Sequence, residues 1–518
     1  MIRGILMMLN NVYRNILLFL GSPRRISLTW VPWAVSLLGF GLSVCFYYPG
    51  DWSYDVSVQH AQAVSGIYGD WHPPVMAASL RWSNRLFNTI FQTNYSRTGI
   101  LFTLHTLFFW GGGASVLVAG NGFWKRLDGK AWILSLVPLF AILVLLRSDL
   151  IPWTASFSKD VGMLGPYLLA TGILLNWPKL KKQRMMVSIL LLFFLVYGTS
   201  LRHNAIFALF PLVVWLTWLL SEKKSVLKIG ILSLLLWTGI LGVIHYVNYG
   251  ILKSTRLYPM QERFYADIFL LNHLTGDYVP PPNSFGNDFS QINQKLFDEY
   301  YCEQTYVVSA MSGLNENTPC DFRLLHNILL FPGANPQPDV VEFIEYEGLG
   351  KKTDIPIPLL KVYQDDIEKT GKEDYAKLRS AWFQRIKKHP AAYIKLRLKT
   401  FYYFCTGSGF QFLGINSWIL LILLTLTLIP PLCRPCRLIN SISFPRVMLG
   451  CSALLYITPY LIFLTAEANR YTYWFLATSV ISLIMFCHES PLIRSLIKKT
   501  ANYWTMLLRS GLSQETRL

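Results

Sequence analysis

The sequence predicts an all-α polytopic membrane protein with about ten transmembrane helices and a mainly helical extracytoplasmic domain between the seventh and eighth. Composition gives the first observation: 53% of the 518 residues are hydrophobic and 15% are charged, whereas roughly a quarter of the residues of a soluble globular chain are charged. Recurring uncharged stretches give the second, and a one-sided distribution of basic residues gives the third. The same composition excludes a disordered chain, a collagen and a small disulfide-rich protein.

Ten stretches of 16 to 21 residues contain no Asp, Glu, Lys or Arg. Because about 17 to 25 mainly apolar residues cross a hydrocarbon layer of about 30 Å, we expect each stretch to form a membrane-spanning helix. The predicted spans are 28–48, 99–119, 131–146, 161–177, 185–201, 204–220, 229–249, 412–432, 447–466 and 471–487.

Basic residues lie mainly in one alternate set of connections between these spans. That set, which includes both chain ends, holds 22 Lys and Arg, whereas the short connections of the other set hold 7. Short loops rich in Lys and Arg stay on the cytoplasmic side, so we expect a multi-pass protein of the inner (cytoplasmic) membrane with both termini in the cytoplasm. The net charge of +18 therefore requires no nucleic-acid partner.

The predicted spans divide the chain into three parts. An N-terminal module, 1–249, would hold spans one to seven and a long first outer loop, 49–98. The segment 250–411 is long enough for a small folded domain and would lie outside the cytoplasm, since long segments translocate regardless of charge. The C-terminal module, 412–518, would hold the last three spans and a cytoplasmic tail.

Cysteine positions agree with this layout. Cys302 and Cys320 fall in the exported segment, where an oxidising compartment would allow a disulfide between them. Cys433 and Cys436 form a C-x-x-C in a predicted cytoplasmic loop, without a second pair or a histidine beside them. Reduced thiols are therefore expected there rather than a zinc site.

The first outer loop carries several polar groups close to the membrane surface. Asp55 and Gln59 are four residues apart and would share one face if this part is helical. Asp70 and His72 come just before two consecutive prolines, which would stop a helix and fix a turn. A carboxylate at the lipid boundary is a candidate general base, and the alternative is an interfacial loop with solvated acids.

The other short outer connections also place polar groups where a span begins or ends. These groups are Lys159 and Asp160 at the fourth span, Arg202 and His203 between the fifth and sixth, and Glu467, Arg470 and Tyr471 before the tenth. Each has a structural explanation, since flanking charges commonly extend to the interface. Their occurrence on one side of the membrane favours a shared site.

Short outer loops are usually depleted of positive charge. The cations of this set therefore indicate an anionic partner. A lipid phosphate at this depth would supply it, and the planar guanidinium of Arg donates two parallel hydrogen bonds to phosphate oxygens. His72 and His203 could instead ligate a divalent metal together with the outer acids, or only form hydrogen bonds. The ligands follow no fixed motif, so the sequence requires no cofactor.

This pattern resembles the GT-C superfamily of integral-membrane glycosyltransferases, which take sugars from polyprenyl-phosphate carriers. The similar segments are short and occur in order along the chain: 55–59, 70–74, 158–160, 202–204, 382–397 and 467–471. The resemblance implies a polyprenyl-phosphate sugar as donor, a cell-surface glycan or lipid as acceptor, and contact with membrane lipids at the outer face.

The resemblance also implies roles for single residues. Asp55 matches the catalytic Asp of the family's first outer loop, which deprotonates or orients the acceptor hydroxyl. The substrate-binding positions would be Gln59, Asp70, His72, Lys159, Asp160, Arg202, His203, Glu467, Arg470 and Tyr471. In the protein O-mannosyltransferase pattern a Glu follows the Asp, whereas Val56 follows here, so the subfamily stays open, as does the choice of Asp55 over Asp51 or Asp70 as the catalytic acid.

Two other functions are compatible with the sequence. An enzyme similar to an O-antigen ligase would also use a lipid-linked donor at this face, and the acid in the first outer loop is the reason to rank it second. A secondary transporter or flippase would place ionisable residues near mid-membrane, often on repeated segments. The centres of the predicted spans here are free of acids and bases, and the chain has no visible internal repeat.

Overall fold

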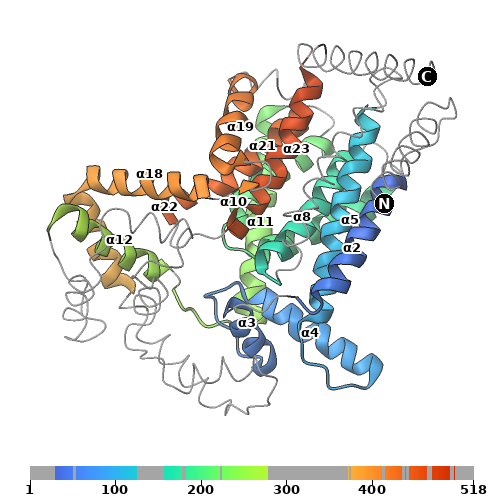
Figure 1. The fold of residues 1–518 in the computed structure, drawn as a ribbon, viewed down its shortest axis with the longest axis horizontal. Coiled ribbons are helices and arrows are strands. Elements are labelled where there is room, and N and C mark those ends of the chain that lie inside the picture. The colour runs from blue at the N-terminus through green and yellow to red at the C-terminus, as the bar shows by residue number, and fades with distance from the viewer. Residues whose placement is uncertain are drawn as a thin grey trace, which may run out of the picture.

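The computed structural model is mostly helical (Figure 1). It describes residues 30–50, 54–124, 157–177, 183–221, 225–258, 260–277, 375–407, 409–410, 415–433, 443–463 and 469–490, with single positions 372, 438 and 495. Helices occupy each predicted span that falls within these residues, whereas the predicted span 131–146 and the two cysteines Cys302 and Cys320 lie outside them.

A bundle of roughly parallel helices forms the larger part of the described chain (Figure 1). Its helices are α2 (Val31–Tyr47), α5 (Gly99–Trp124), α8 (Lys159–Asn176), α9 (Arg184–Ser200), α10 (Ala205–Leu220), α11 (Val226–His245), α19 (Ser417–Leu432), α21 (Phe444–Ile457) and α23 (Tyr473–Glu489). Short helical pieces extend it, namely η5 (Tyr246–Ile251), α22 (Tyr460–Phe463) and η7 (Asn469–Thr472).

Within the described residues, 3 helical segments are long and apolar enough to cross a membrane: Gly99–Ala119, Val226–Ile251 and Phe444–Ile462. The shorter apolar helices are Pro32–Tyr47, Arg184–Ser200, Ala205–Leu220, Ser417–Leu432 and Tyr473–Cys487. A membrane protein is therefore supported, while the full number of spans stays a prediction.

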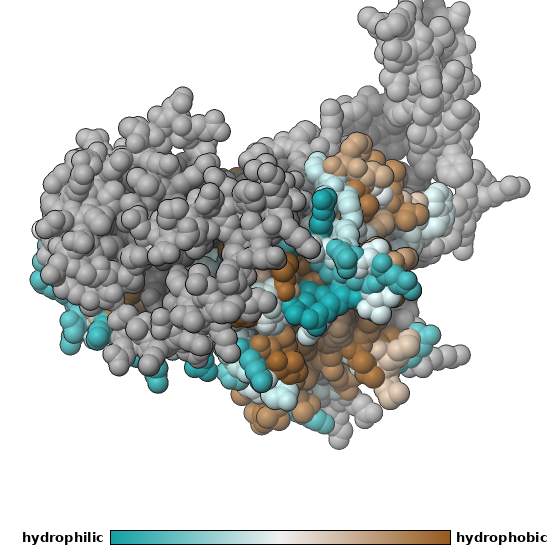
Figure 2. All heavy atoms as spheres, turned by 90° about the horizontal axis from the view of Figure 1, so that it is seen from below, coloured by the Kyte–Doolittle hydropathy of each residue, from teal (hydrophilic) through white to brown (hydrophobic). Residues whose placement is uncertain are grey.

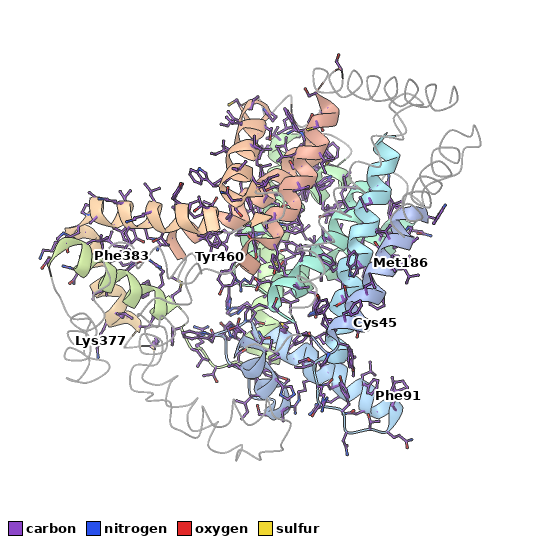
Figure 3. The ribbon with its side chains drawn as sticks, in the orientation of Figure 1. Cys45, Phe91, Met186, Lys377, Phe383 and Tyr460 are labelled. Carbon is purple, nitrogen blue, oxygen red and sulfur yellow. The ribbon has the colours of Figure 1, made fainter. Side chains whose placement is uncertain are left out.

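Large apolar side chains remain exposed on the outside of the described helices. Met186 is 80% exposed, Leu227 is 73% exposed and Phe91 is 61% exposed, and Figure 3 shows Phe91 and Met186 at the periphery. Seen from below, hydrophilic side chains form a band bordered by hydrophobic surface (Figure 2). Such extensive apolar surface is unfavourable in water, and contact with lipid accounts for it.

The segment predicted to form the first outer loop contains a pair of helices, α3 (Tyr54–Ser65) and α4 (Pro74–Phe91). The left-handed backbone of Gly66, with φ of 76°, follows α3 and lets the chain turn. Pro74 is the first residue of α4, a favoured position because its missing N–H would have no partner within the helix. The prolines therefore begin a helix here, whereas the sequence suggested that they would stop one.

Close packing of α5 against α8 fixes the start of α8. A Cβ added at Gly112 would lie 2.6 Å from Cβ of Leu168, and one added at Gly165 would lie 2.8 Å from the backbone nitrogen of Phe109. Small residues allow such close approach between helices in membranes. The α8 N-terminus, which carries two of the predicted site residues, is thereby held against α5.

A smaller helical unit lies beside the bundle and contains α12 (Met260–Thr275), a helix over 375–388 and α18 (Pro390–Gly407). In Figure 1, α18 runs across the direction of α19. The two-stranded antiparallel pair β1 (Gly409–Phe410) and β2 (Ile415–Asn416) follows α18. A separate apolar cluster of Phe264, Ile268, Leu378 and Trp382 joins α12 to the helix 375–388, and Tyr393 of α18 packs against it.

A buried carboxylate at the centre of this unit connects it to the bundle. Asp267 is fully buried and accepts hydrogen bonds from Arg263 and, at 2.9 Å, from Nε1 of Trp382. Nη1 of Arg397 lies 3.7 Å from the same carboxylate. Arg397 also donates from Nε to the carbonyl oxygen of Leu461 at 2.8 Å and from Nη2 to that of Tyr460 at 3.2 Å. The smaller unit is thus attached to α22.

Candidate functional site

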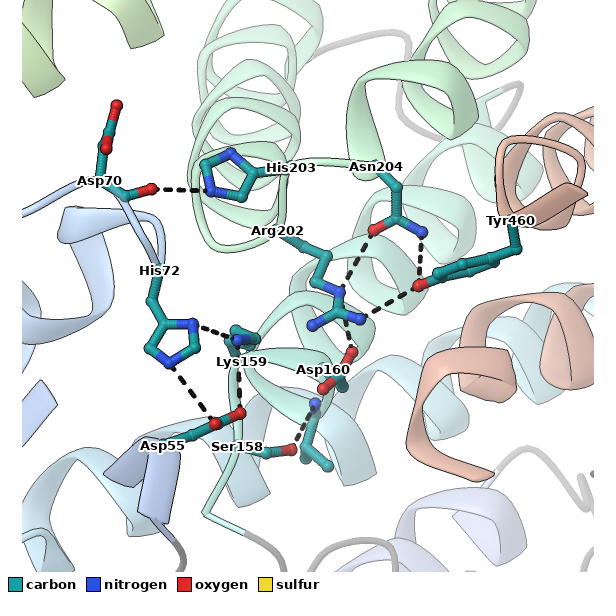
Figure 4. Close-up of polar contacts among 11 residues, drawn as sticks. Asp55, Asp70, His72, Ser158, Lys159, Asp160, Arg202, His203, Asn204 and Tyr460 are labelled. Carbon is teal, nitrogen blue, oxygen red and sulfur yellow. Dashed lines mark hydrogen bonds and ion pairs between the residues drawn. The ribbon is translucent and has the colours of Figure 1, made fainter. Parts of the chain in front are cut away.

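Asp55, His72 and Lys159 meet at the end of the bundle that carries α3 (Figure 4). Nζ of Lys159 lies 2.6 Å from Nδ1 of His72 and 3.4 Å from Oδ2 of Asp55. Nε2 of His72 lies 3.4 Å from Oδ1 of Asp55. Residues 55 and 159 are far apart in the chain, so the fold brings together a carboxylate, an ammonium and an imidazole that the sequence predicts to lie on one face of the membrane.

Local structure explains how Asp55 and Lys159 are held. Asp55 lies in the first turn of α3, where a negative charge is favourable near the helix N-terminus. Ser158 caps α8, since its hydroxyl oxygen accepts a hydrogen bond from the backbone N–H of Val161 at 3.4 Å. Lys159 is the first residue of that helix, and the positive end of the α8 dipole adds to its charge.

His72 is a neutral link between the other two groups. Burial, together with the nearby ammonium of Lys159, lowers the pKa of His72 from 6.5 to about 4. The ring is therefore neutral at pH 7. Nδ1 then accepts a hydrogen bond from Lys159, and Nε2 carries the proton and faces Asp55. The negative charge of Asp55, whose side chain is 21% exposed, is balanced by Lys159.

Arg202 and Asp160 form a second, adjacent group. Nε of Arg202 lies 3.1 Å from Oδ1 of Asp160, whose side chain is 1% exposed. The same nitrogen donates to Oδ1 of Asn204 at 3.2 Å, and Nη2 donates to the hydroxyl of Tyr460 at 3.0 Å. The guanidinium carbon also lies 4.4 Å from the ring centre of Tyr471, a cation–π contact. Because Asp160 directly follows Lys159, the two groups share one segment of α8.

One edge of the Arg202 guanidinium has no protein partner in the described part of the chain. Its contacts there use Nε and Nη2, and Nη1 makes no hydrogen bond with a described residue. The side chain is nevertheless held on two sides by Tyr460 and Tyr471, whose rings stack at 5.8 Å. A fixed guanidinium with an unused N–H edge is suited to bind an anionic oxygen.

Asp70 fastens the predicted first outer loop to η5 and the residues after it, and His203 contacts the same loop from the turn between α9 and α10. Oδ2 of Asp70 accepts from the hydroxyl of Tyr249 at 2.8 Å, and Oδ1 accepts from the backbone N–H of Leu257 at 2.6 Å. The backbone carbonyl of Asp70 lies 3.2 Å from Nε2 of His203. Gly69 and Thr255 also form a parallel β-bridge. Both carboxylate oxygens of Asp70 are therefore occupied by the protein itself.

The remaining predicted site residues are placed differently. Gln59 is buried on α3, one turn beyond Asp55. Tyr471 lies over Arg202, as described above. Arg470 belongs to η7, but its side chain, like the whole of Glu467, lies outside what the structure describes. The structure thus brings together Asp55, His72 and Lys159, and next to them Asp160 and Arg202.

Three contributors were not anticipated from the sequence. Asn204 precedes α10 but does not cap it, because its side chain instead donates to the hydroxyl of Tyr460 at 2.9 Å and accepts from Arg202. Its position directly after Arg202-His203 was the available signal. Tyr460 and Tyr249 lie within predicted spans, where an aromatic residue gives no sign of a polar contact.

A metal site was one alternative for the histidines and acids. Among the described residues, no group of three or more His, Cys, Asp or Glu is arranged to hold a metal ion. His72 also has Lys159 rather than a second acid at its Nδ1, and an ammonium beside a ligand nitrogen opposes cation binding. The described site is better suited to an anion flanked by cations.

Comparison of the chain with known protein families, with curated proteins and with solved structures finds no match. The resemblance to the GT-C superfamily therefore stays a prediction from short segments. Function has to be inferred from the side chains and distances of the site.

Proposed function

We propose that this chain is a membrane glycosyltransferase that moves a sugar from a polyprenyl-phosphate donor to a cell-surface glycan or lipid acceptor, at the outer face of the inner membrane. One observation carries the proposal: an acid, Asp55, lies within 3.4 Å of Lys159, and the segment that holds Lys159 continues into the Asp160–Arg202 pair. A carboxylate and two cations are the groups that this reaction needs.

Each charged side chain has a separate role in the proposed reaction. The acceptor hydroxyl oxygen forms a bond to the anomeric carbon while the bond from that carbon to the phosphate oxygen breaks. The electron pair of the broken bond stays on the phosphate, and the hydroxyl proton passes to Asp55. Lys159 and Arg202 stabilise the phosphate charge that develops as the bond breaks. No general acid is needed for this leaving group.

Asp55 is suited to act as the base because it is the more accessible of the two carboxylates. Its side chain is 21% exposed, whereas that of Asp160 is 1% exposed. Asp160 holds Arg202 in place. His72 is neutral at pH 7 and orients Asp55 through its Nε2–H. It therefore adds no further charge to the site.

A reconstitution experiment tests the proposal. The full chain is placed in proteoliposomes with radiolabelled undecaprenyl-phosphate hexoses and pentoses, and membranes of cells that lack the chain supply the acceptor. We expect label to move from one of these donors to a glycan or lipid, with release of undecaprenyl phosphate. Transfer only from a diphosphate-linked glycan would indicate a ligase, and flux of unchanged donor across the vesicle would indicate a flippase. Either result would reject the proposal.

A further inference from the structure

Two glutamine side chains on α3 have buried polar atoms that form no hydrogen bond with the described part of the chain. Gln59 is 2% exposed and Gln62 is 6% exposed. Nε2 of Gln59 and Oε1 of Gln62 are both buried, and neither has a partner among the described residues. Buried amide groups in proteins are nearly always hydrogen-bonded, because an unsatisfied donor or acceptor loses its interaction with water without replacement.

The two glutamines share one face of α3 with Asp55. Positions 55, 59 and 62 are related by four and three residues, which places side chains one above another along a helix. With a rise of about 1.5 Å per residue, Gln59 lies about 6 Å and Gln62 about 10 Å along the helix axis from Asp55. We call Asp55, Gln59 and Gln62 the α3 column.

The chemistry of the α3 column narrows the class of ligand. It offers, in order, a carboxylate oxygen that accepts, an amide N–H that donates and an amide oxygen that accepts. A fully ionised phosphate has only acceptors, so it would be repelled by Asp55 and would leave Oε1 of Gln62 unpaired. A purely apolar ligand would satisfy neither amide. A polyol satisfies all three groups, because each hydroxyl both donates and accepts.

We propose that the α3 column binds the hydroxyl groups of a carbohydrate acceptor, with the reacting hydroxyl at Asp55 and further hydroxyls at Gln59 and Gln62. This inference rests on the proposed glycosyl transfer and names the acceptor as a polyhydroxylated sugar. The length of the column corresponds to about two sugar rings. Since both amides are buried in the free chain, binding includes a local opening around α3, and Asp55 is the accessible end.

Methionine replaces glutamine with a side chain of similar length and no amide. Gln59→Met and Gln62→Met remove the unpaired polar atoms, so we expect melting temperatures equal to or above that of the wild type in lipid nanodiscs. A glutamine with a purely structural hydrogen bond would instead lower the melting temperature when replaced. Gln183→Met is the matched control, since Gln183 is exposed and makes no capping hydrogen bond.

Kinetics then separate acceptor recognition from donor use. With undecaprenyl-phosphate glucose as donor and methyl glycosides or disaccharides as soluble acceptor probes, each Met variant should raise the acceptor KM by about 5- to 10-fold, the loss expected for one hydrogen bond. Gln183→Met should leave the acceptor KM unchanged. An unchanged acceptor KM, or a lowered melting temperature in both variants, would overturn the proposal.

If no donor is consumed, the proposed transfer reaction is rejected. Sugar binding by the α3 column can still be tested. The same methyl glycosides and disaccharides are then titrated into the wild-type chain, with cyclohexanemethanol as a probe that lacks the array of hydroxyls. We expect a saturable rise in melting temperature with the sugars that is lost in Gln59→Met and Gln62→Met and kept in Gln183→Met. If the sugars do not raise the melting temperature, or if they still raise it in the Met variants, the proposal that the α3 column binds sugars is overturned.

Discussion

Nζ of Lys159 lies 2.6 Å from Nδ1 of His72 in a buried environment. This contact connects the first residue of α8 to the segment that enters α4, and it makes the imidazole an acceptor toward the lysine. A protonated His72 would place a second positive charge beside the ammonium, which is unfavourable at low effective dielectric. The local charge pattern, with Asp55 ionised and His72 neutral, therefore depends on this pair.

Stability should fall as the pH drops below neutrality, in part because of His72. Its pKa is about 4 in the folded chain and about 6.5 when unfolded. Between these values the unfolded chain binds a proton that the folded chain does not. The contribution of His72 to the free energy of unfolding is therefore complete above about pH 6.5 and is lost as the pH falls toward 4. The total amounts to about 3 kcal/mol. Thermal melting from pH 7.5 to 4 should show a shallower slope for His72→Asn than for the wild type, and equal slopes would contradict the assignment.

Removing the lysine should raise the pKa of His72. Lys159→Met takes away the second cause of the lowered pKa and leaves the larger one, burial, so we expect a value above about 4 but still below 6.5. Histidine-selective NMR titration would measure it, with His72→Asn to assign the signal. Lys377→Met, at an exposed position on the helix 375–388 (Figure 3), should leave the titration unchanged. An unchanged titration of His72 in Lys159→Met would argue against the contact between Lys159 and His72.

Arg202 and Asp160 should depend on each other for stability. Arg202→Met leaves the buried carboxylate of Asp160 without its guanidinium partner, and such a broken buried pair costs about 3 to 5 kcal/mol. Replacing both residues, as Asp160→Asn with Arg202→Met, should cost less than the sum of the two single changes. A double-mutant cycle on melting temperatures measures this coupling, and additive effects would show that the two side chains act independently.

Asp70 should act by fastening the first outer loop rather than by supplying charge. Asp70→Ala removes the acceptor of the Leu257 N–H and of the Tyr249 hydroxyl, so hydrogen exchange at the amide of Leu257 should accelerate. The expected loss of stability is about 1 to 3 kcal/mol. Asp277→Ala provides a control, because Asp277 pairs instead with Arg385 and His389 in the smaller unit. Unchanged protection at Leu257 would show that the loop is held by other contacts.

The helical segments could be predicted from the sequence because a helix that crosses a membrane needs a long run of uncharged residues. The predicted spans 185–201 and 204–220, for example, nearly coincide with α9 and α10. Their ends agree because Arg184 and the Arg202-His203 turn mark where polar groups begin. The helices of the first outer loop were harder to predict, since α3 is only weakly apolar and the role of Pro74 depends on which side of it the helix lies.

The charged members of the site could be predicted as a group, but their pairing could not. One-sided placement pointed to Asp55, Lys159 and Arg202, because a charge at a span end on the outer side needs a partner. Nothing in the sequence indicates that Asp160, rather than Asp55, pairs with Arg202, or that Asp70 is occupied by Tyr249. Those choices depend on how α3, α8 and α11 pack, which single-residue patterns do not encode.

The most direct test of the account is to separate donor binding from turnover in Asp55→Asn. Proteoliposomes with the wild type, Asp55→Asn or the control Asp277→Asn are given one equivalent of labelled undecaprenyl-phosphate sugar together with acceptor membranes. If Asp55 removes the acceptor proton, Asp55→Asn should bind the donor with unchanged affinity and form product at least about 100-fold more slowly, while Asp277→Asn turns over normally. Product formation at the wild-type rate by a folded Asp55→Asn protein would contradict the account.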